Sequence, residues 1–169
     1  GEAEAGPQSR PGFDVRSIAV DPHPAARDRA LHFGADLALD SGDPLLREQV
    51  LGATGGAGLE AAFDFAGAPP VREQALSVLA PKGRLVLVGL SDQPLTVDRS
   101  TRFSYLQHRI LGHYGSEEHH VAQLVRLAEG GRLDFSRSIT DVLPLEEVAT
   151  AVRRMETKEG APVRLILRP

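Results

Sequence analysis

The sequence contains no cysteine and no tryptophan, and aromatic residues make up only 5% of it. Without cysteine the chain can form no disulfide, and it offers neither a thiolate zinc ligand nor a cysteine nucleophile. Aliphatic side chains must therefore supply most of the apolar core. Hydrophobic residues make up 41% and charged residues 25% of the 169 positions, as is typical of a globular protein.

Long apolar runs and an excess of positive charge are also missing. No run approaches the roughly 20 residues that a transmembrane helix needs, and residues 1–12 hold no hydrophobic signal-peptide core. The formal net charge is −4 and no basic stripe interrupts it. We therefore expect no nucleic-acid partner, no membrane partner and, by default, a cytoplasmic location.

The composition changes after the first residues of the chain. Residues 1–12 are small, polar and proline-containing, which predicts a mobile tail because little apolar surface is available for burial. Residues 13–169 have the length of one ordinary domain. We expect a single domain there.

Short apolar segments alternate with helical patterns along this domain. The predicted strands are Val15–Val20, Leu37–Leu39, Ala61–Phe65, Arg84–Gly89, Arg109–Tyr114 and Val163–Leu167. The predicted helices are Ala25–Phe33, Leu45–Leu51, Pro70–Leu79, His119–Glu129 and Leu145–Met155. Gly34 is expected in a left-handed helix cap, and Pro81–Gly83 in a turn. The alternation predicts an α/β fold with a doubly wound, mostly parallel, Rossmann-like sheet.

Three phrases carry a resemblance to a known family. They are IAVDPHPAARDRALHFGADLALDSGD, then FDFAGAPPVREQALSVLAPKGRLVLVGL, then RILGHYGS together with PLEEVATAVRRMETKEGAPVRLIL. In this order, over Val15–Leu167, they resemble the cofactor-binding half of zinc-type, medium-chain alcohol dehydrogenases. The resemblance implies the nucleotide-binding portion of an NAD(P)-dependent oxidoreductase.

The same resemblance assigns roles near the cofactor's adenosine and pyrophosphate. Asp21 matches the acid that accepts hydrogen bonds from the adenosine ribose and favours NAD, although it also fits a helix N-cap. Gly67 matches a strand-end glycine beside the adenosine half, and a simple turn explains it equally well. Arg164 matches a pyrophosphate-binding cation, against the alternative of a solvated charge at a strand end.

Further assignments concern backbone groups on the nicotinamide side. Val88 and Gly89 match the end of the strand that follows the second phrase. His113 and Gly115 match the strand whose backbone binds the nicotinamide carboxamide in the family. These are main-chain roles, so the side chains constrain them weakly.

The sequence departs from the family in two ways that bear on function. Nothing from Gly1 to Asp14 reads as the strand and G-x-G-x-x-G turn that hold the pyrophosphate, and no GroES-like domain with catalytic zinc ligands is present. We therefore assign no catalytic residue and no metal ligand, expect NAD binding to be weakened or lost, and predict negligible activity. Without that strand, Val15–Val20 is expected to pair directly with Ala61–Phe65, or else to leave a damaged sheet.

Two other signals have plain interpretations. The loop Thr54–Gly58 precedes a strand and has no phosphate-binding lysine, and Glu117–His120 fits a helix N-terminus better than a metal site. Partners remain open between a homodimer through Arg109–Tyr114 and a separate catalytic-domain chain. The alternative function is a cofactor-free domain that offers a pocket for non-redox chemistry or a dimerisation scaffold.

Overall fold

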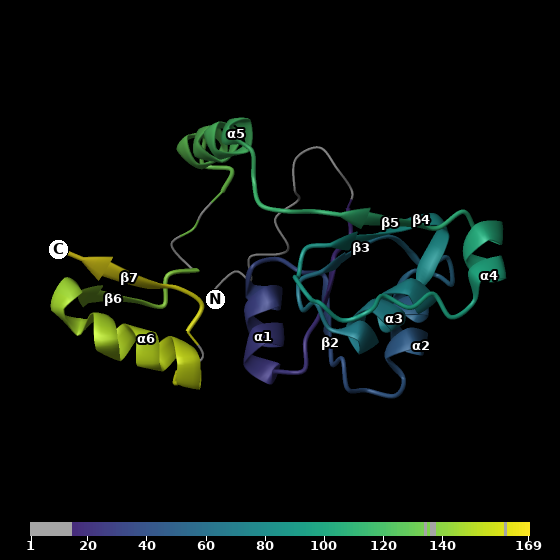
Figure 1. Cartoon of the computed structure of the whole chain (residues 1–169), viewed down its shortest axis with the longest axis horizontal. Coiled ribbons are helices and arrows are strands. Elements are labelled where there is room, and N and C mark those ends of the chain that lie inside the picture. Colours follow the sequence, from purple (N-terminus) through teal and green to yellow (C-terminus); the bar gives the residue numbers. More distant parts are fainter. Residues whose placement is uncertain (1–14, 134, 136–137, 161) are drawn as a thin grey trace, which may run out of the picture. The chain divides into compact units, whose positions relative to one another are not determined.

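The computed structural model describes residues 15–133, 135, 138–160 and 162–169, and its element order can be followed in Figure 1. The predicted tail, residues 1–12, lies outside the described residues. We predicted one domain over residues 13–169, and the contacts divide the chain after His113 into two compact units. Each unit is described by itself.

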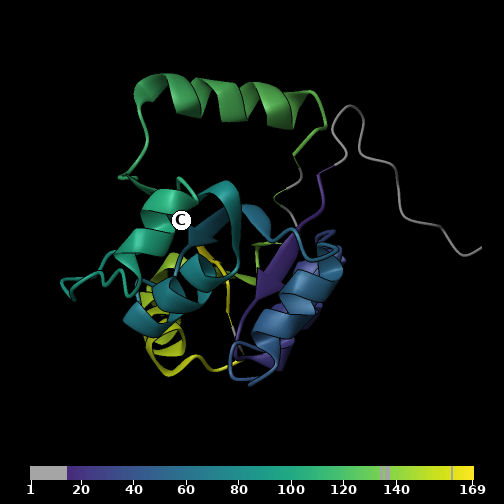
Figure 2. The ribbon, with the colours of Figure 1, turned by 90° about the vertical axis from the view of Figure 1, so that its right-hand side faces the viewer.

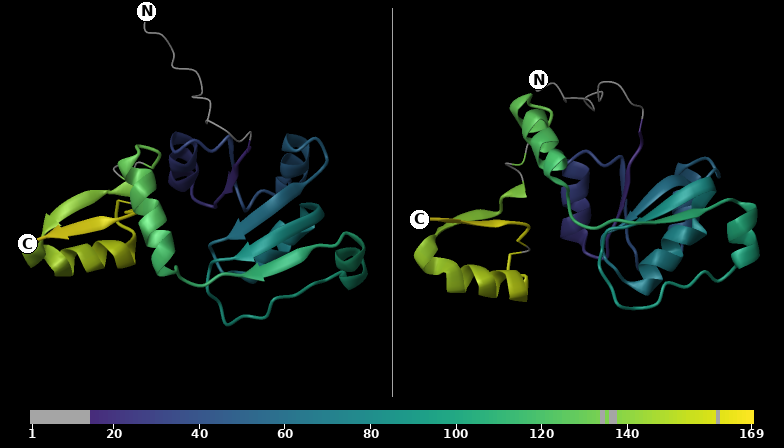
Figure 3. Two further views of the ribbon diagram at one scale, coloured as in Figure 1. Left: turned by 90° about the horizontal axis from the view of Figure 1, so that it is seen from above. Right: turned by 45° about the horizontal axis from the view of Figure 1, so that its top comes forward.

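The first unit alternates strands and helices, as the sequence predicts. Its elements are β1 (Ile18–Val20), α1 (Pro24–His32), β2 (Leu37–Leu39), α2 (Leu46–Ala53), β3 (Leu59–Asp64), α3 (Pro69–Ser77), β4 (Leu79–Leu87), α4 (Ser100–Tyr105) and β5 (Arg109–Gly112). All of its strand pairs are parallel: β1 with β2, β3 with β4, and β4 with β5, the last three strands lying side by side in Figure 3. The predicted α/β class with parallel strands is confirmed.

Local signals account for the bounds of the first helix. Pro24 occupies its first turn, where a missing N–H removes no helical hydrogen bond. Gly34 has φ +94° just beyond its end, in the left-handed conformation that we predicted. Ala35 N–H then donates to the Ala30 carbonyl at 2.9 Å, which satisfies a carbonyl of the last turn.

The turn predicted at Pro81–Gly83 is wrong, because these residues lie inside β4. The pairing of β3 with β4 moves from Leu59 opposite Leu79 to Ala61 opposite Arg84, so the extra residues form a bulge. Lys82 has φ +64° at this bulge, and its N–H donates to the Leu106 carbonyl at 2.7 Å. The turn residues thus kink a strand and do not end it.

The predicted direct pairing of Val15–Val20 with Ala61–Phe65 is also wrong. Among the described residues, β1 pairs only with β2, and β3 pairs only with β4. A cavity of about 290 Å³ is bordered by Ile18 of β1 and Leu59 of β3, so space remains between these two strands. The observed arrangement is the interrupted sheet that we considered as the alternative.

A side-chain cluster holds the two strand groups together across this interruption. Buried Leu46 and Val50 of α2 pack with Leu39 and Val78, and Ile18, Leu37 and Leu59 border the same cluster. Figure 2 shows α2, in blue, beside the purple β1. Because α2 contacts both strand groups, apolar burial joins β1–β2 to β3–β4 where no backbone ladder does.

The second unit is a small α/β assembly. It contains α5 (Glu118–Glu129), β6 (Asp141–Pro144), the 3-10 turn η2 (Leu145–Glu147), α6 (Val148–Thr157) and β7 (Leu165–Arg168), with β6 and β7 parallel. The helix predicted at Leu145–Met155 therefore starts with a 3-10 turn. Arg154 of α6 donates to Asp141 of β6 at 2.9 Å and ties the helix to the strand.

Candidate functional site

The carboxyl ends of β3, β4 and β5 meet at one edge of the three-stranded sheet, where parallel α/β sheets bind ligands. Gly67 follows β3 with φ +70°, and a Cβ on it would lie 2.5 Å from the Leu90 carbonyl oxygen. A Cβ on Gly89, after β4, would lie 2.4 Å from the Gly67 nitrogen. Both glycines are therefore required for close packing between the two strand-end loops.

A buried ion pair lies directly beneath these loops. Arg72 of α3 donates from Nε to Asp64 Oδ2 at 2.8 Å, and the two side chains are 5% and 0% exposed. Asp64 Oδ1 accepts hydrogen bonds from the N–H groups of Ala66 and Gly67, each at 2.9 Å. The carboxylate thus fixes the backbone that leaves β3.

The same arginine also holds the neighbouring loop. Its second guanidinium contact runs from Nη2 to the Gly89 carbonyl at 3.0 Å. The amides of Val88 and Gly89 donate to the Asp64 carbonyl at 2.9 and 2.7 Å. One buried side-chain pair therefore sets the relative position of the loops that carry Gly67, Val88 and Gly89.

Sequence reasoning missed both members of this pair. Asp64 lies within the FDF phrase, and Arg72 stands eight positions later. No periodic or spacing signal marks an arginine on this helix as buried. The signal that could have found it is the strand-end aspartate, since a buried carboxylate requires a cation or several N–H donors.

The structure brings four of the assigned residues to this edge. Besides Gly67, Val88 and Gly89, His113 lies at the end of β5, and its N–H donates to the Leu87 carbonyl at 3.1 Å. The His113 side chain is exposed. These positions fit the backbone roles that the resemblance implies, and those roles stay predictions.

Gly115 and Arg164 belong to the second unit. Gly115 has φ +60° and open space around its Cβ position. Arg164 is exposed and donates from Nη1 to Ser138 Oγ at 3.0 Å. Arg164, directly before β7, thus has a neutral hydroxyl partner within its own unit, and its role toward a pyrophosphate stays a prediction.

Asp21 follows β1 in the first unit. Its Oδ1 accepts a hydrogen bond from the His23 N–H at 2.8 Å, which is an Asx turn, and His23 is the residue that precedes the first turn of α1. The N-cap interpretation of Asp21 is therefore wrong by two positions. Only one carboxylate oxygen is used in this turn, so the other can accept hydrogen bonds from a ligand hydroxyl.

The helices that follow β1 and β3 both begin with proline. A helix N-terminus holds phosphate through free backbone N–H groups and its dipole. Pro24 stands in the first turn of α1, and Pro69 and Pro70 stand in that of α3. Because proline has no N–H, these helices have fewer donors for a pyrophosphate.

The Glu117–His120 segment forms the start of α5. The Glu117 N–H donates to His120 Nδ1 at 3.1 Å, and His119 Nδ1 lies 3.3 Å from the Glu117 carboxylate. These contacts stabilise a helix N-terminus, in agreement with the capping interpretation. Over the part of the chain that the structure describes, no three His, Asp or Glu side chains lie close enough to hold a metal ion. Those residues therefore do not fit a zinc ion.

Comparison with known proteins places these features among dehydrogenases. The profile of the family described as zinc-binding dehydrogenase matches residues 12–130. An alcohol dehydrogenase from Cupriavidus necator is 27% identical over 156 residues, which are 90% of this chain and 42% of that protein. An L-threonine 3-dehydrogenase from Pyrococcus horikoshii is 28% identical over 127 residues, which are 73% of this chain and 36% of that protein.

Solved structures agree with the fold. The alcohol dehydrogenase from Thermotoga maritima superposes with a TM-score of 0.81 at 22% identity, over 92% of this chain and 43% of that one. An alcohol dehydrogenase zinc-binding domain protein from Burkholderia ambifaria gives a TM-score of 0.81 at 28% identity, over 91% and 42%. The chain thus spans less than half the length of these relatives.

None of the helices in the described ranges has the length and apolarity to cross a membrane.

Proposed function

Because the chain belongs to the zinc-binding dehydrogenase family, we propose that it is the cofactor-binding portion of an NAD(P)-dependent oxidoreductase. The observation that carries this proposal is the edge formed by the ends of β3, β4 and β5. There the Asp64–Arg72 pair fixes the two loops that hold Gly67, Val88 and Gly89. When bound, the nicotinamide would supply the hydride acceptor or donor of the reaction.

Asp21 supports a preference for NAD. Its carboxylate has one oxygen engaged in the Asx turn, which leaves the other for the two hydroxyls of an adenosine ribose. A 2′-phosphate at the same place would face this negative charge. NAD is therefore the cofactor that the described residues favour over NADP.

The affinity of this chain for NAD is expected to be weak. Helices α1 and α3 begin with proline, which has no N–H, so their N-termini have fewer amides to offer a pyrophosphate. The described residues also hold no cluster of three His, Asp or Glu side chains that fits a zinc ion. We expect negligible alcohol-dependent or ketone-dependent turnover of the cofactor by the chain alone. Measurable turnover without any added protein would contradict this expectation.

Two kinds of partner remain within the proposal. The outer edge of β5 carries no strand among the described residues, so it can pair with the β5 of a second copy. A separate chain with a catalytic domain is the other. Sedimentation of the purified chain separates a homodimer from a monomer.

A cofactor-free domain is the second candidate function. The prolines at the start of α1 and α3 favour it, because proline has no N–H to offer a phosphate at these helix N-termini. Such a domain would use a pocket for non-redox chemistry, or would act as a dimerisation scaffold.

Titration with NADH by calorimetry separates the two functions. Binding with a dissociation constant in the micromolar to low millimolar range supports the cofactor-binding portion. The Asp21→Asn variant should then bind several-fold more weakly, since its amide keeps the Asx turn but loses the charge that attracts ribose hydroxyls. Asp28→Asn, on the exposed side of α1, is the matched control. No heat of binding at millimolar NADH would favour the cofactor-free domain.

A further inference from the structure

A second hollow in the first unit lies away from the strand-end edge. It has a volume of about 580 Å³, which is within the range of about 300–1,000 Å³ for small-molecule sites. Its walls come from α2, α3, α4 and the segment that leads into α4. None of the residues assigned to the cofactor lines it, so it is a separate feature of the molecule.

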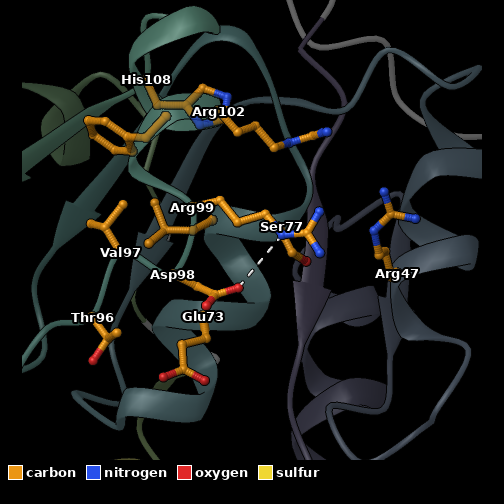
Figure 4. Close-up of a pocket in the computed structure, with 11 residues that line it drawn as sticks. Arg47, Glu73, Ser77, Thr96, Val97, Asp98, Arg99, Arg102 and His108 are labelled. Carbon is orange, nitrogen blue, oxygen red and sulfur yellow. Dashed lines mark ion pairs between the residues drawn. The ribbon is translucent and has the colours of Figure 1, made fainter.

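Three arginines line this hollow and come from different elements. Arg47 stands in the first turn of α2, Arg99 directly precedes α4, and Arg102 lies within α4. Figure 4 shows the side chains of Arg99 and Arg102 extended toward the side from which Arg47 projects. Side chains from separate elements thus present their guanidinium groups to one space.

These guanidinium groups make few hydrogen bonds or ion pairs within the described part of the chain. Over the described residues, Arg47 and Arg102 make no side-chain hydrogen bond and no ion pair. Arg99 has only Asp98, at 3.8 Å, with both side chains mostly exposed. An exposed ion pair at this distance contributes little to the free energy of folding. Besides Asp98, the hollow contains one other carboxylate, Glu73. Positive charge therefore exceeds negative charge here, although the chain as a whole carries −4.

The rest of the lining combines two hydroxyl side chains, Ser77 and Thr96, with aliphatic and aromatic groups. Leu76 of α3 and Val97 contribute aliphatic surface. Phe103 meets the ring of His108 edge to face, with 5.8 Å between the ring centroids. The His108 Nε2 atom is shielded from solvent and has no hydrogen-bond partner among the described residues. The site therefore combines anion-binding donors with a surface for a hydrocarbon or aromatic group.

We propose that this hollow binds an organic phosphate, with the phosphate group between Arg47, Arg99 and Arg102 and the organic part against Leu76, Val97 and Phe103. Guanidinium groups match the geometry of phosphate oxygens and form charge-assisted hydrogen bonds with them. A dianionic phosphate also satisfies more than one arginine at once. A bare inorganic anion leaves the apolar wall uncovered, whereas an organic phosphate covers it with its hydrocarbon part.

Phenyl phosphate is the probe, and titration is followed by amide and imidazole NMR signals of the full chain. The signals of His108, Arg102 and Thr96 should move together, whereas those of Asp21 and Gly67 should not. Inorganic phosphate should bind at least several-fold more weakly than phenyl phosphate, because it lacks the apolar part. Equal binding of the two would overturn the role of the apolar wall.

Variants test the arginines. Arg47→Gln and Arg102→Gln should each weaken phenyl phosphate binding about tenfold, equivalent to about 1.4 kcal/mol. Arg153→Gln, an exposed arginine of α6, is the matched control and should leave binding unchanged. Asp98→Asn should strengthen binding about threefold, since it frees Arg99 from its weak ion pair.

Measuring phenyl phosphate and NADH binding in the same variants distinguishes this site from the proposed cofactor edge. Loss of phenyl phosphate binding in Arg102→Gln with unchanged NADH binding supports a separate site. An equal loss in Arg153→Gln and Arg102→Gln would show only a general charge effect and would overturn the proposal. NMR shifts on phenyl phosphate addition at the ends of β3 and β4 would also overturn the proposal. Thermal melting of each variant serves as the folding control, and Tm should stay within about 2 °C of the parent.

Discussion

Removal of Arg72 is the sharpest test of how the strand-end edge is held. Arg72→Met keeps much of the side-chain length but leaves the Asp64 carboxylate buried without its cation, since both side chains are at most 5% exposed. Breaking a buried pair from one side typically costs about 3–5 kcal/mol. The free energy of unfolding of the first unit should fall by that amount.

The expected change in melting temperature follows from the size of the unit. For a domain of about this length, 1 kcal/mol corresponds to about 4 °C, so Arg72→Met should lower Tm by roughly 12–20 °C. Differential scanning calorimetry and urea titration measure the two quantities independently. Arg84→Met, an exposed arginine in β4, is the control and should change stability by less than about 0.5 kcal/mol.

A double substitution separates the effect of the buried charges on stability from the effect of the hydrogen bonds to the backbone. In Asp64→Leu with Arg72→Met the buried charges are gone, but the N–H groups of Ala66 and Gly67 lose their acceptor. The double variant should therefore remain less stable than the parent by about 1–3 kcal/mol. If Arg72→Met alone lies within about 1 kcal/mol of the parent, the pair does not hold the loops and the reasoning fails.

Two further predictions concern the strand-end glycines and the second unit. Gly89→Ala should destabilise the first unit by about 1–3 kcal/mol, because its Cβ would lie 2.4 Å from the Gly67 nitrogen, whereas Gly112→Ala meets nothing within 4 Å and should be neutral in the same urea titration. The hydrogen bond from Arg154 and that from the Val142 N–H hold the pKa of Asp141 below its ordinary value of 3.8. The stabilisation from this group is therefore present above pH 3.8 and is lost as the pH falls through the lowered pKa. Protection factors of β6 amides, taken relative to the intrinsic exchange rate at each pH, should fall over that acidic range in the parent, and an equally steep fall in Arg154→Gln would contradict this assignment.

The sequence by itself determined the type and order of most elements, because their signals are local. The proline in the first turn of α1, the glycine at position 34 and the apolar run of β4 each act within a few residues of the feature that they specify. Two short elements carried no such signal. Helix α4 holds six residues and β6 holds four, so neither is long enough to show a period.

The family resemblance identified the residues at the strand ends, but not the side chains that fix their position. Gly67, Val88 and Gly89 follow strands that the pattern identifies, so their common edge was predictable from parallel topology. The burial of Arg72 was not, because it depends on where α3 sits over β3 and β4. Sequence letters mark an arginine as exposed by default.

Only the tertiary structure decided how the sheet is interrupted and which distant charges meet. Backbone pairing between β1 and β3 was a reasonable expectation from the unpaired edges, yet α2 packs against both groups through side chains and a cavity remains between the strands. Arg47 and Arg102 are separated by the whole of β3 and β4 in the chain and line the same hollow. Contacts of this kind depend on how whole helices and strands pack against one another. Helix caps and hydrophobic periodicity act between residues that are close in the sequence, so the sequence alone could predict them.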